Sequence, residues 1–450
     1  MNKSDIIIIG AGPAGYKAAE YAAKNGLSVT VFEKSDIGGT CLNAGCIPTK
    51  TLAHIAEVII SLSHSDTFGL CDLSYYIDYL KVFERQKSVV NSLKNGIEYL
   101  LDKPNINVIR TTASFIDEKT VVADNVEYCA DNILIATGSQ NKPLNDSVKQ
   151  CINICDSTDL LHLCSVPKSI CIIGAGVIGM EFASIFNAFG VDVYVIEFLK
   201  ECLPSLDSEI SKRLRKCLEK RGIHFYLQSA VTEINENGVI FKDRKDVLHT
   251  INSEIVLAAV GRKPNVDGLN LNAINVELDN CAIPVDKDYF NVISKDGALK
   301  NVYAVGDVNG IQMLAHAAEM QAIHVINHIL DIHDNIRFDV MPAAIFTNPE
   351  AAAVGSTEDE CKSMGVDFCL KKSYWRANGK AKAMNEDDGM LKIIFDKNGY
   401  ILGAHAFGAH SADIIQELSV LMCKDTTMQQ LKDMIHIHPT FSEIIKAALD

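Results

Sequence analysis

The stretch IIIIGAGPAGYKAAEYAAKNGLSVTVFE, residues 6–33, decides the fold of this chain. Four isoleucines predict a short buried strand, and a turn with Gly10, Gly12 and Gly15 leads directly into an alanine-rich helix. A second predicted strand follows and ends at Glu33. Together, strand, glycine turn, helix, strand and acid are typical of a dinucleotide-binding unit, in which the turn approaches a pyrophosphate and the acid holds ribose hydroxyls.

A second copy of this pattern spans residues 170–197, where Gly174, Gly176 and Gly179 form the turn and the second strand ends at Glu197. In both copies the acid lies eighteen residues after the third glycine, which indicates two dinucleotide-binding domains and two dinucleotides. A carboxylate at this strand end accepts hydrogen bonds from an unmodified ribose but repels a 2′-phosphate. Since no arginine follows Glu197 directly, the second copy predicts NAD rather than NADP.

Two cysteines lie close together in GGTCLNAGCIPTK, residues 38–50, directly after the first dinucleotide pattern. A disulfide between Cys41 and Cys46 needs Cα atoms about 4.4–6.8 Å apart, whereas five residues of regular α-helix rise about 7.5 Å. A bridge therefore requires a distorted turn, which Gly45 makes easier and Pro48 favours by disfavouring a helical conformation at the residue before it. The motif alone fits either a redox-active disulfide or two unpaired thiols.

Length, composition and charge exclude several classes of protein. A chain of 450 residues, 48% hydrophobic and 22% charged, can bury large cores and predicts about three domains. The formal charge of −15 argues against a nucleic-acid partner, and no apolar run is long enough for a membrane span or a signal peptide. Fourteen cysteines without a secretory signal predict reduced thiols and a cytoplasmic location, so any disulfide is expected to be catalytic.

Several other stretches predict elements of the nucleotide domains. Two buried strands end at Gly138 and Gly261, and each is a plausible crossing point out of a nucleotide domain. Another buried strand ends at Asp307, whose carboxylate can accept hydrogen bonds from a polyol or cap a loop or helix. Residues 52–101 predict long helical segments with core-facing apolar positions, and residues 315–330 predict a further helix.

The segment from about residue 338 changes character and lacks a glycine fingerprint. Its alternating strands and helices predict an α+β domain. The expected strands cover 343–346, 389–395 and 400–407, and the expected helices cover 412–422 and 441–449.

A histidine and a glutamate lie near the C-terminal end, in HPTFSE at residues 438–443. Thr440 and Glu443 form a capping-box pattern, in which Glu443 would satisfy the first amides of the last helix. Alternatively, Pro439 fixes the turn at His438 and Glu443 orients and charges its imidazole, which makes a base suited to thiol chemistry. The spacing leaves both interpretations open.

In this order, the motifs resemble the pyridine nucleotide–disulfide oxidoreductases, and within them most closely the dihydrolipoamide dehydrogenases of 2-oxo-acid dehydrogenase and glycine-cleavage complexes. The resemblance covers essentially the whole chain. It is carried by residues 38–50, by AVGDVNG at 304–310, by MLAH at 313–316 and by HPTFSE at 438–443.

The resemblance implies an α/β fold with two Rossmann-like dinucleotide-binding domains, one for FAD and one for NAD, and a C-terminal α+β dimerisation domain. A homodimer then belongs to the mechanism, because the family's base enters the active site from the other subunit. The implied boundaries are 1–142 for the FAD domain, 143–265 for the NAD domain, 266–337 for the return segment that completes the FAD domain, and 338–450 for the dimerisation domain.

The same resemblance implies oxidation of dihydrolipoamide to lipoamide with reduction of NAD+, and a lipoyl-bearing domain of a larger complex as partner. Cys41 would face the substrate and Cys46 the flavin, with His438 and Glu443 as the base and Lys50 paired with Glu181 near the flavin. The implied FAD residues are Gly10, Gly12, Gly15, Glu33, Lys50, Gly138, Asp307, Leu314 and Ala315, and the implied NAD residues are Gly174, Gly176, Gly179, Glu197 and Gly261. No metal ligand is implied.

The chain departs from the family pattern at three places. Residues 411–413 read Ser-Ala-Asp where the family more often has Gly-Glu at the last two positions, so the substrate channel is expected to differ. Thr49 replaces a commoner serine, which we expect to be silent, and residues 316–321 lack a glycine that is usual after the acid.

Three alternatives stay open from the sequence. Glutathione-type reductases favour NADPH and carry basic residues where this chain has residues 197–199, and mercuric reductases carry a C-terminal cysteine pair that residues 446–450 lack. The third alternative is an FAD-binding subunit of a larger complex without turnover. Such a scaffold would not need the two cysteines and the distal His-Glu pair together.

Overall fold

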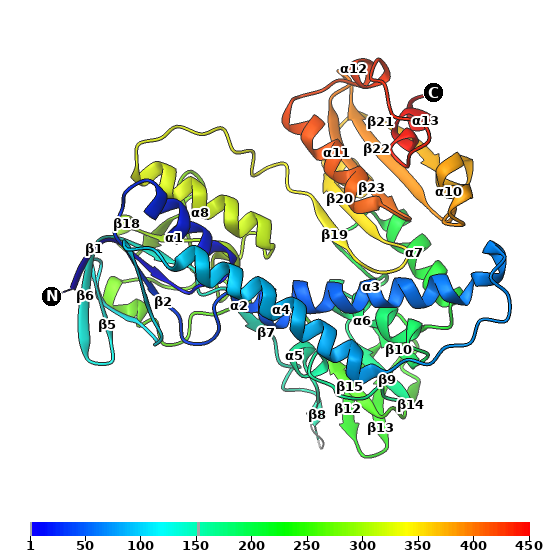
Figure 1. Ribbon diagram of the computed structural model, residues 1–450, viewed down its shortest axis with the longest axis horizontal. Coiled ribbons are helices and arrows are strands. Elements are labelled where there is room, and N and C mark those ends of the chain that lie inside the picture. Colours follow the sequence, from blue (N-terminus) through cyan, green and yellow to red (C-terminus); the bar gives the residue numbers. More distant parts are fainter. Residues whose placement is uncertain (1, 151–153) are drawn as a thin grey trace. The chain divides into compact units, whose positions relative to one another are not determined.

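The computed structural model describes residues 2–150 and 154–450 (Figure 1). Met1 and residues 151–153, which fall within the expected FAD and NAD domains, lie outside the described part. The chain forms two compact units. The first comprises Met1–Thr51, Phe83–Lys142 and Gly261–Ile336, and the second comprises Leu52–Val82, Pro143–Val260 and Arg337–Asp450. The expected domain boundaries stay predictions.

A mainly parallel sheet organises the first unit, with strands in the order β17-β18-β6-β1-β2-β3 and with β4 and β5 as an antiparallel extension of β6. β1 pairs in parallel with both β2 and β6, and its isoleucines are buried. A parallel sheet is covered on both faces, which explains the continuous apolar run in the sequence. The bounds are β1 (Asn2–Ile9), β2 (Val29–Phe32), β3 (Ile106–Ile109), β4 (Ser114–Asp117), β5 (Thr120–Ala123), β6 (Val126–Ile135), β17 (Asn291–Ser294) and β18 (Gly297–Ala304).

Helices α1 (Pro13–Lys24) and α8 (Ala315–Ile329) pack side by side in this unit (Figure 1). Their buried faces are rich in alanine, which lets the two backbones approach closely. The helices expected within 52–101 are confirmed as α3 (Cys46–Ser63) and α4 (Tyr79–Leu101), which cross the sequence boundaries of the units. The remaining elements of this unit are α2 (Gly39–Ala44), β7 (Ser139–Asn141), β16 (Arg262–Pro264) and short 3-10 turns at Leu271–Ile274 and Gly306–Asn309. A further 3-10 turn at Ser65–Phe68 belongs to the second unit.

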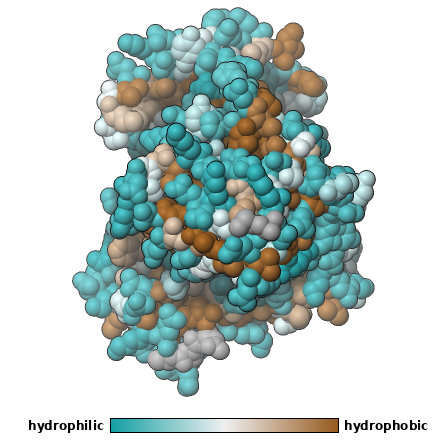
Figure 2. Space-filling model, turned by 90° about the vertical axis from the view of Figure 1, so that its left-hand side faces the viewer, coloured by the Kyte–Doolittle hydropathy of each residue, from teal (hydrophilic) through white to brown (hydrophobic). Residues whose placement is uncertain are grey.

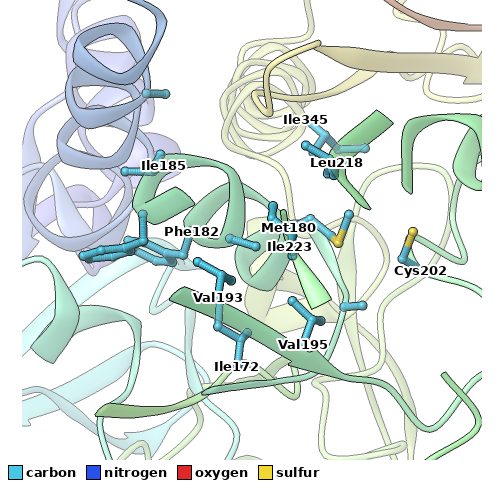
Figure 3. Close-up of a cluster of buried hydrophobic side chains, with 14 of the residues drawn as sticks. Ile172, Met180, Phe182, Ile185, Val193, Val195, Cys202, Leu218, Ile223 and Ile345 are labelled. Carbon is cyan, nitrogen blue, oxygen red and sulfur yellow. The ribbon is translucent and has the colours of Figure 1, made fainter. Parts of the chain in front are cut away.

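The second dinucleotide pattern forms a parallel sheet, β11-β10-β9-β15, in the second unit. Its helix α6 is apolar almost all round, so Met180 and Phe182 share one buried cluster with Ile172 and Val193 of the sheet (Figure 3). The expected strand–turn–helix–strand is therefore confirmed. The bounds are α5 (Ser157–Leu160), β9 (Ser169–Ile173), α6 (Val177–Ala188), β10 (Asp192–Ile196), α7 (Ser208–Lys220), β11 (His224–Tyr226) and β15 (Ile255–Ala258), with a second sheet of β8 (Lys149–Gln150), β12 (Ala230–Asn235), β13 (Gly238–Lys242) and β14 (Leu248–Ile251).

The C-terminal segment forms an antiparallel sheet in the order β19-β20-β23-β22-β21. The expected α+β character is confirmed, with β19 (Ala343–Ile345), β22 (Met390–Asp396), β23 (Ile401–Phe407), α11 (Ser411–Cys423) and α13 (Glu443–Leu449) close to their expected bounds. The last helix begins two residues later than expected. Elements absent from the prediction are β20 (Ala351–Gly355), α9 (Glu358–Ser363), β21 (Phe368–Tyr374), a 3-10 turn at Trp375–Ala377, α10 (Gly379–Ala383) and α12 (Met428–Lys432).

The elements that the sequence analysis did not predict were missed for two different reasons. β20 reads AAAVG, which has low intrinsic strand propensity, and two adjacent lysines interrupt the apolar pattern of β21; both form strands by pairing with their neighbours. Helices α9 and α12, by contrast, each begin with a complete capping box, Thr357 with Glu360 and Thr427 with Gln430. The capping-box pattern is visible in the sequence, so α9 and α12 could have been predicted from it.

The apolar residues lie mainly in buried clusters such as the one in Figure 3. Figure 2 shows a face on which hydrophilic residues predominate and hydrophobic residues form small patches. Within residues 2–150 and 154–450, no helix combines the length and the apolar character that a membrane crossing requires.

Candidate active site

The two glycine-rich turns have the same geometry. Gly10 and Gly174 each adopt φ of 105°, a conformation that side chains rarely allow. A Cβ added at Gly15 would lie 1.8 Å from the Gly10 oxygen, and one at Gly179 would lie 2.1 Å from the Gly174 oxygen. The turns can therefore keep their shape only with glycine at these positions.

The acids that end the second strands, Glu33 and Glu197, hold these turns in place. Glu33 Oε2 accepts a hydrogen bond from the Ala11 amide at 2.7 Å, and Glu197 Oε2 accepts one from the Ala175 amide at 2.6 Å. The other oxygen of each carboxylate accepts an amide two residues farther along, at 2.7 and 2.8 Å. Each carboxylate oxygen retains a second lone pair, so both acids can still accept ribose hydroxyls.

Gly12 and Gly176 are the N-cap residues of the helices that follow the turns, and neither provides a side-chain cap. The first amides of each helix are therefore available to an anion, which the helix dipole also attracts. A Cβ added at Gly176 would meet no protein atom within 4 Å, so there is space next to the backbone. Both turns fit the pyrophosphate of a dinucleotide.

Asp307 lies just after β18, in the first unit, and is held by side chains from two other segments. Ser139 Oγ donates a short hydrogen bond to Asp307 Oδ2, and Arg262 Nε donates to the same Ser139 oxygen at 2.7 Å. The Gly306 amide donates to Gln321 Oε1 at 2.8 Å. This arrangement fixes a carboxylate that can accept hydrogen bonds from a polyol.

The two expected crossing points lie next to each other in this unit. The amide of Asn265 donates to the Gly138 oxygen at 2.9 Å, and the amide of Lys142 donates to the Gly261 oxygen at 3.0 Å. β7 and β16 pair antiparallel directly after these glycines. The sequence did not predict a role for Ser139 or Arg262. Each directly follows one of the two glycines, so the position next to the glycine was the available signal.

The cysteine pair lies where two helices meet. α2 ends at Ala44, Gly45 breaks the helical path with φ −150° and ψ −114°, and α3 begins at Cys46. The expected distorted turn is thus confirmed. The expectation for the residue before Pro48 is wrong, because Ile47 is helical; α3 has only just begun there, where a proline is well tolerated.

Cys41 and Cys46 are both thiols in this structure, both are partly exposed, and their side chains hydrogen bond to each other. The hydrogen bond to Cys46, followed by burial and the charge of Cys46, raises the pKa of Cys41. Lys50, one turn into α3, acts in the opposite direction, and Glu319 adds to the rise. The site therefore brings together two neighbouring sulfurs and a lysine, which is what thiol–disulfide exchange needs.

The second unit contains the His-Glu pair. His438 Nδ1 lies 2.9 Å from Glu443 Oε1, and Glu443 Oε2 accepts the Thr440 amide at 3.0 Å. The Thr440 hydroxyl donates to the Ile437 oxygen at 2.7 Å, so only one half of the capping box forms. The Thr440 amide and then His438 hold the pKa of Glu443 below its usual range, so Glu443 stays charged beside the imidazole.

Other predicted residues are placed as follows. Leu314 is the N-cap of α8, and Ala315 is its first residue. Glu181 is buried in α6 and accepts the Phe346 amide at 2.9 Å. Lys50 belongs to the first unit and Glu181 to the second, and their pairing stays a prediction.

The departure at residues 411–413 lies at the first turn of α11. Its N-cap, His410, adopts φ of 60° and gives no side-chain cap, while Glu350 Oε2 accepts the Ala412 amide at 3.2 Å. Burial raises the pKa of Glu350. A partly buried acid from the segment between β19 and β20 therefore takes the capping role here. Within the described part of the chain, no three or more His, Cys, Asp or Glu side chains are placed together so that they could hold a metal ion.

Comparison with known proteins agrees with this geometry. Residues 4–322 match the family described as pyridine nucleotide-disulphide oxidoreductase, and residues 341–449 match the dimerisation domain of that family. The chain is 34% identical to the mitochondrial dihydrolipoyl dehydrogenase of Pisum sativum, with 99% of this chain and 91% of that protein covered. It is also 34% identical to the dihydrolipoyl dehydrogenase of Geobacillus stearothermophilus, with 100% and 96% covered.

The solved structures include a similar protein of the same general class. The HOCl-induced flavoprotein disulfide reductase RclA from Escherichia coli superposes with a TM-score of 0.84 at 30% identity, with 99% of both chains covered. The similarity to this reductase therefore covers the folds of both units of the chain.

Proposed function

Since the chain belongs to the pyridine nucleotide–disulphide oxidoreductase family, we propose that it oxidises dihydrolipoamide to lipoamide and reduces NAD+ to NADH. It is an oxidoreductase of the flavoprotein disulfide class and uses FAD and NAD. The observation that carries the choice of chemistry is the pair of neighbouring thiols, Cys41 and Cys46, at the break between α2 and α3. Relatives at about 34% identity support dihydrolipoamide as the substrate.

The proposed reaction starts from the Cys41–Cys46 disulfide. His438, with Glu443 behind it, takes a proton from one thiol of dihydrolipoamide, and the resulting thiolate attacks the Cys41 sulfur. A mixed disulfide forms while Cys46 leaves as a thiolate. The second substrate thiol then attacks the substrate sulfur of the mixed disulfide while its proton passes to the departing Cys41 sulfur, which releases lipoamide and leaves Cys41 as a thiol and Cys46 as a thiolate. When bound, FAD carries the two electrons onward to NAD+.

The base comes from a second copy of the chain in this proposal. The dimerisation-domain match at residues 341–449 supports a homodimer. The His438 side chain is 80% exposed in the single chain, so it is accessible to the thiol pair of a partner. The lipoyl-bearing domain of a 2-oxo-acid dehydrogenase or glycine-cleavage complex is the proposed source of the dithiol.

The remaining assignments place FAD on the first glycine turn and NAD on the second. Glu33 and Glu197 would accept the adenosine ribose hydroxyls, and Asp307 would accept the polyol of FAD. Lys50 and Glu181 would lie near the flavin, together with backbone groups at Gly138, Leu314 and Ala315. Gly261 would border the NAD site.

Steady-state assays of the purified holoenzyme test the substrate. Dihydrolipoamide, glutathione disulfide and Hg(II) are compared, each with NAD(H) and with NADP(H). We expect kcat/KM for dihydrolipoamide with NAD+ to exceed every other combination by about 100-fold, which is the discrimination that specific contacts to a substrate provide. A larger kcat/KM with glutathione disulfide or with Hg(II) would overturn the proposal.

Replacing Gly176 with alanine tests the second turn. A Cβ there meets no protein atom within 4 Å, and φ of −75° suits alanine, so the melting temperature should not change. The methyl group would, however, stand where the pyrophosphate must approach the backbone. We expect KM for NAD+ to rise about tenfold, equivalent to about 1.4 kcal/mol of binding. An unchanged KM would contradict the placement of NAD.

A further inference from the structure

We propose that Glu319, anchored by Tyr16, is a positioning residue that keeps the Cys41 thiol protonated in the reduced enzyme and thereby leaves the thiolate on Cys46. The inference rests on the proposed redox role of the two cysteines. It concerns only the first unit, where all the residues lie.

The hydrogen bond from Tyr16 that anchors Glu319 joins two packed helices. Tyr16 lies in the first turn of α1 and Glu319 in the second turn of α8, and the Tyr16 hydroxyl donates to Glu319 Oε1 at 2.8 Å. α1 and α8 lie side by side (Figure 1). A Cβ added at Gly306 would meet Ala318 at 3.0 Å and Ala14 at 3.8 Å, so the starts of both helices come together at this point. The carboxylate is therefore fixed near the beginnings of α1 and α8.

The short helix that carries Cys41 lies against the same place. The Gly38 amide donates to the Ala11 oxygen at 2.9 Å, so the turn before α2 is hydrogen-bonded to the turn before α1. A Cβ added at Gly39 would lie 2.7 Å from the Gly12 Cα, which shows how closely the two backbones approach. Cys41 is the third residue of α2, and it lies within electrostatic reach of both Glu319 and Tyr16.

Charged and titratable groups reach Cys41 from three helices: Cys46 and Lys50 from α3, Glu319 from α8 and, through Glu319, Tyr16 from α1. The hydrogen bond to Cys46 and burial are the largest causes of the raised pKa of Cys41; Lys50 opposes them, and Glu319 supports them. Burial and then the hydrogen bond to Glu319 raise the pKa of Tyr16, so the phenol stays protonated and remains a donor.

The anchored Glu319 thus places a negative charge within electrostatic reach of the Cys41 sulfur. A carboxylate beside Cys41 disfavours a negative charge on that sulfur. Two-electron reduction of the disulfide with uptake of one proton yields one thiol and one thiolate, and the proton settles on Cys41. The thiolate is then Cys46, the sulfur assigned to the flavin side.

Alkylation measures this asymmetry without turnover. FAD-loaded wild-type and Glu319→Gln proteins are reduced with a phosphine and treated with iodoacetamide between about pH 6 and pH 9, since only thiolates react. Trypsin releases residues 35–50 as one peptide with both cysteines, and fragment ions show which one is labelled. Removing the charge should move the Cys41 profile to lower pH and raise its rate at pH 7 roughly threefold, because lower basicity also reduces nucleophilicity.

Two further variants make the result decisive. Glu20→Gln removes a carboxylate one turn farther along α1 that Lys17 and Lys24 already pair with, so it should leave the Cys41 profile unchanged. Tyr16→Phe keeps the charge of Glu319 but removes the hydrogen bond that anchors it. The Cys41 alkylation profile should therefore move to lower pH, but by less than in Glu319→Gln. The proposal is overturned if Glu319→Gln matches wild type, or if Glu20→Gln shifts the profile as much. If Glu319→Gln does not retain FAD, an unchanged profile in Tyr16→Phe overturns it. Failure of the proposed function would instead appear as a wild-type protein without dihydrolipoamide turnover.

Discussion

Replacing His438 with glutamine is expected to lower dihydrolipoamide turnover at least about 100-fold, because a positioned general base contributes roughly 10²–10⁴ in rate. Glutamine can still hydrogen-bond to Glu443 but cannot take a proton from the substrate thiol. The structure places the two partners 2.9 Å apart, so the substitution removes the base and little else.

A reaction that needs no base provides the control. NADH oxidation with an artificial electron acceptor does not require a dithiol to lose a proton, so His438→Gln should keep that activity and its bound FAD. Near-normal dihydrolipoamide turnover would return His438 and Glu443 to a structural role at the start of α13, where Glu443 accepts the Thr440 amide.

Mixed dimers test whether the base comes from the partner. A dimer of one Cys46→Ser chain and one His438→Gln chain contains one complete site if thiols and base come from different chains, and none if they come from the same chain. Random reassociation of the two inactive variants should therefore restore about a quarter of wild-type turnover. No recovery, with mixed dimers demonstrated by mass spectrometry, would contradict a base from the second subunit.

The sequence predicted the parts of this protein that local chemistry determines. Gly10, Gly15, Gly174 and Gly179 were identified because the turns leave no room for a Cβ, a constraint visible as a repeated glycine spacing. The break between α2 and α3 was predicted because the allowed distance between bridged cysteines is short. The sequence predicted three of the five strands of the C-terminal sheet, and β20 and β21 were missed because they depend on pairing with neighbouring strands.

Residues that act through contacts far apart in the sequence were missed. Tyr16 reaches Glu319 across 303 positions and Ser139 reaches Asp307 across 168, so no window of sequence contains both members of either pair. Tyr16 looked like an ordinary helix residue, and Glu319 looked like part of a motif that lacks its usual glycine. Gln321, in the same motif, accepts the Gly306 amide and so holds that turn.

The buried lysine Lys392 is the other position where a single change should have a large effect. Its side chain is 1% exposed, and its Nζ lies 2.7 Å from carboxylate oxygens of Asp207 and Glu358 and 3.2 Å from Glu209. Burial alone would lower the pKa of Lys392, but the hydrogen bonds to Asp207 and Glu358 raise it above its usual value. Asp207, which is completely buried, also caps α7 by accepting the Glu209 amide. This cluster fixes the start of α7 to the C-terminal sheet within the second unit.

Replacing Lys392 with methionine should therefore lower the free energy of unfolding by about 3–5 kcal/mol, because removing one partner leaves buried carboxylates without a counter-charge. Lys372→Met is the matched control: Lys372 pairs with Lys392 across β21 and β22 and contacts the same Glu209 at 2.7 Å, but it is 32% exposed. Its loss should cost less than about 1 kcal/mol. Denaturant titration of both variants makes the comparison, and equal losses would contradict the buried-network account.

The pH dependence of stability provides a second test of the same network. Burial acts to raise the pKa of Glu209, but hydrogen bonds from Lys372, Arg213 and Lys392 lower it to about 2. A carboxylate with a lowered pKa stabilises the folded state above its unfolded pKa, and that stabilisation is lost as the pH falls toward the folded value. Wild-type stability should therefore decline between about pH 4.5 and pH 2. In Lys392→Met the pKa of Glu209 should lie closer to its unfolded value, so the decline in stability over this pH range should be smaller.

The double variant Lys392→Met/Asp207→Asn separates charge from packing in this cluster. Replacing Asp207 with asparagine removes the unpaired buried charge and should recover part of the lost stability. A further loss would show that the cluster stabilises the fold by packing and not by charge.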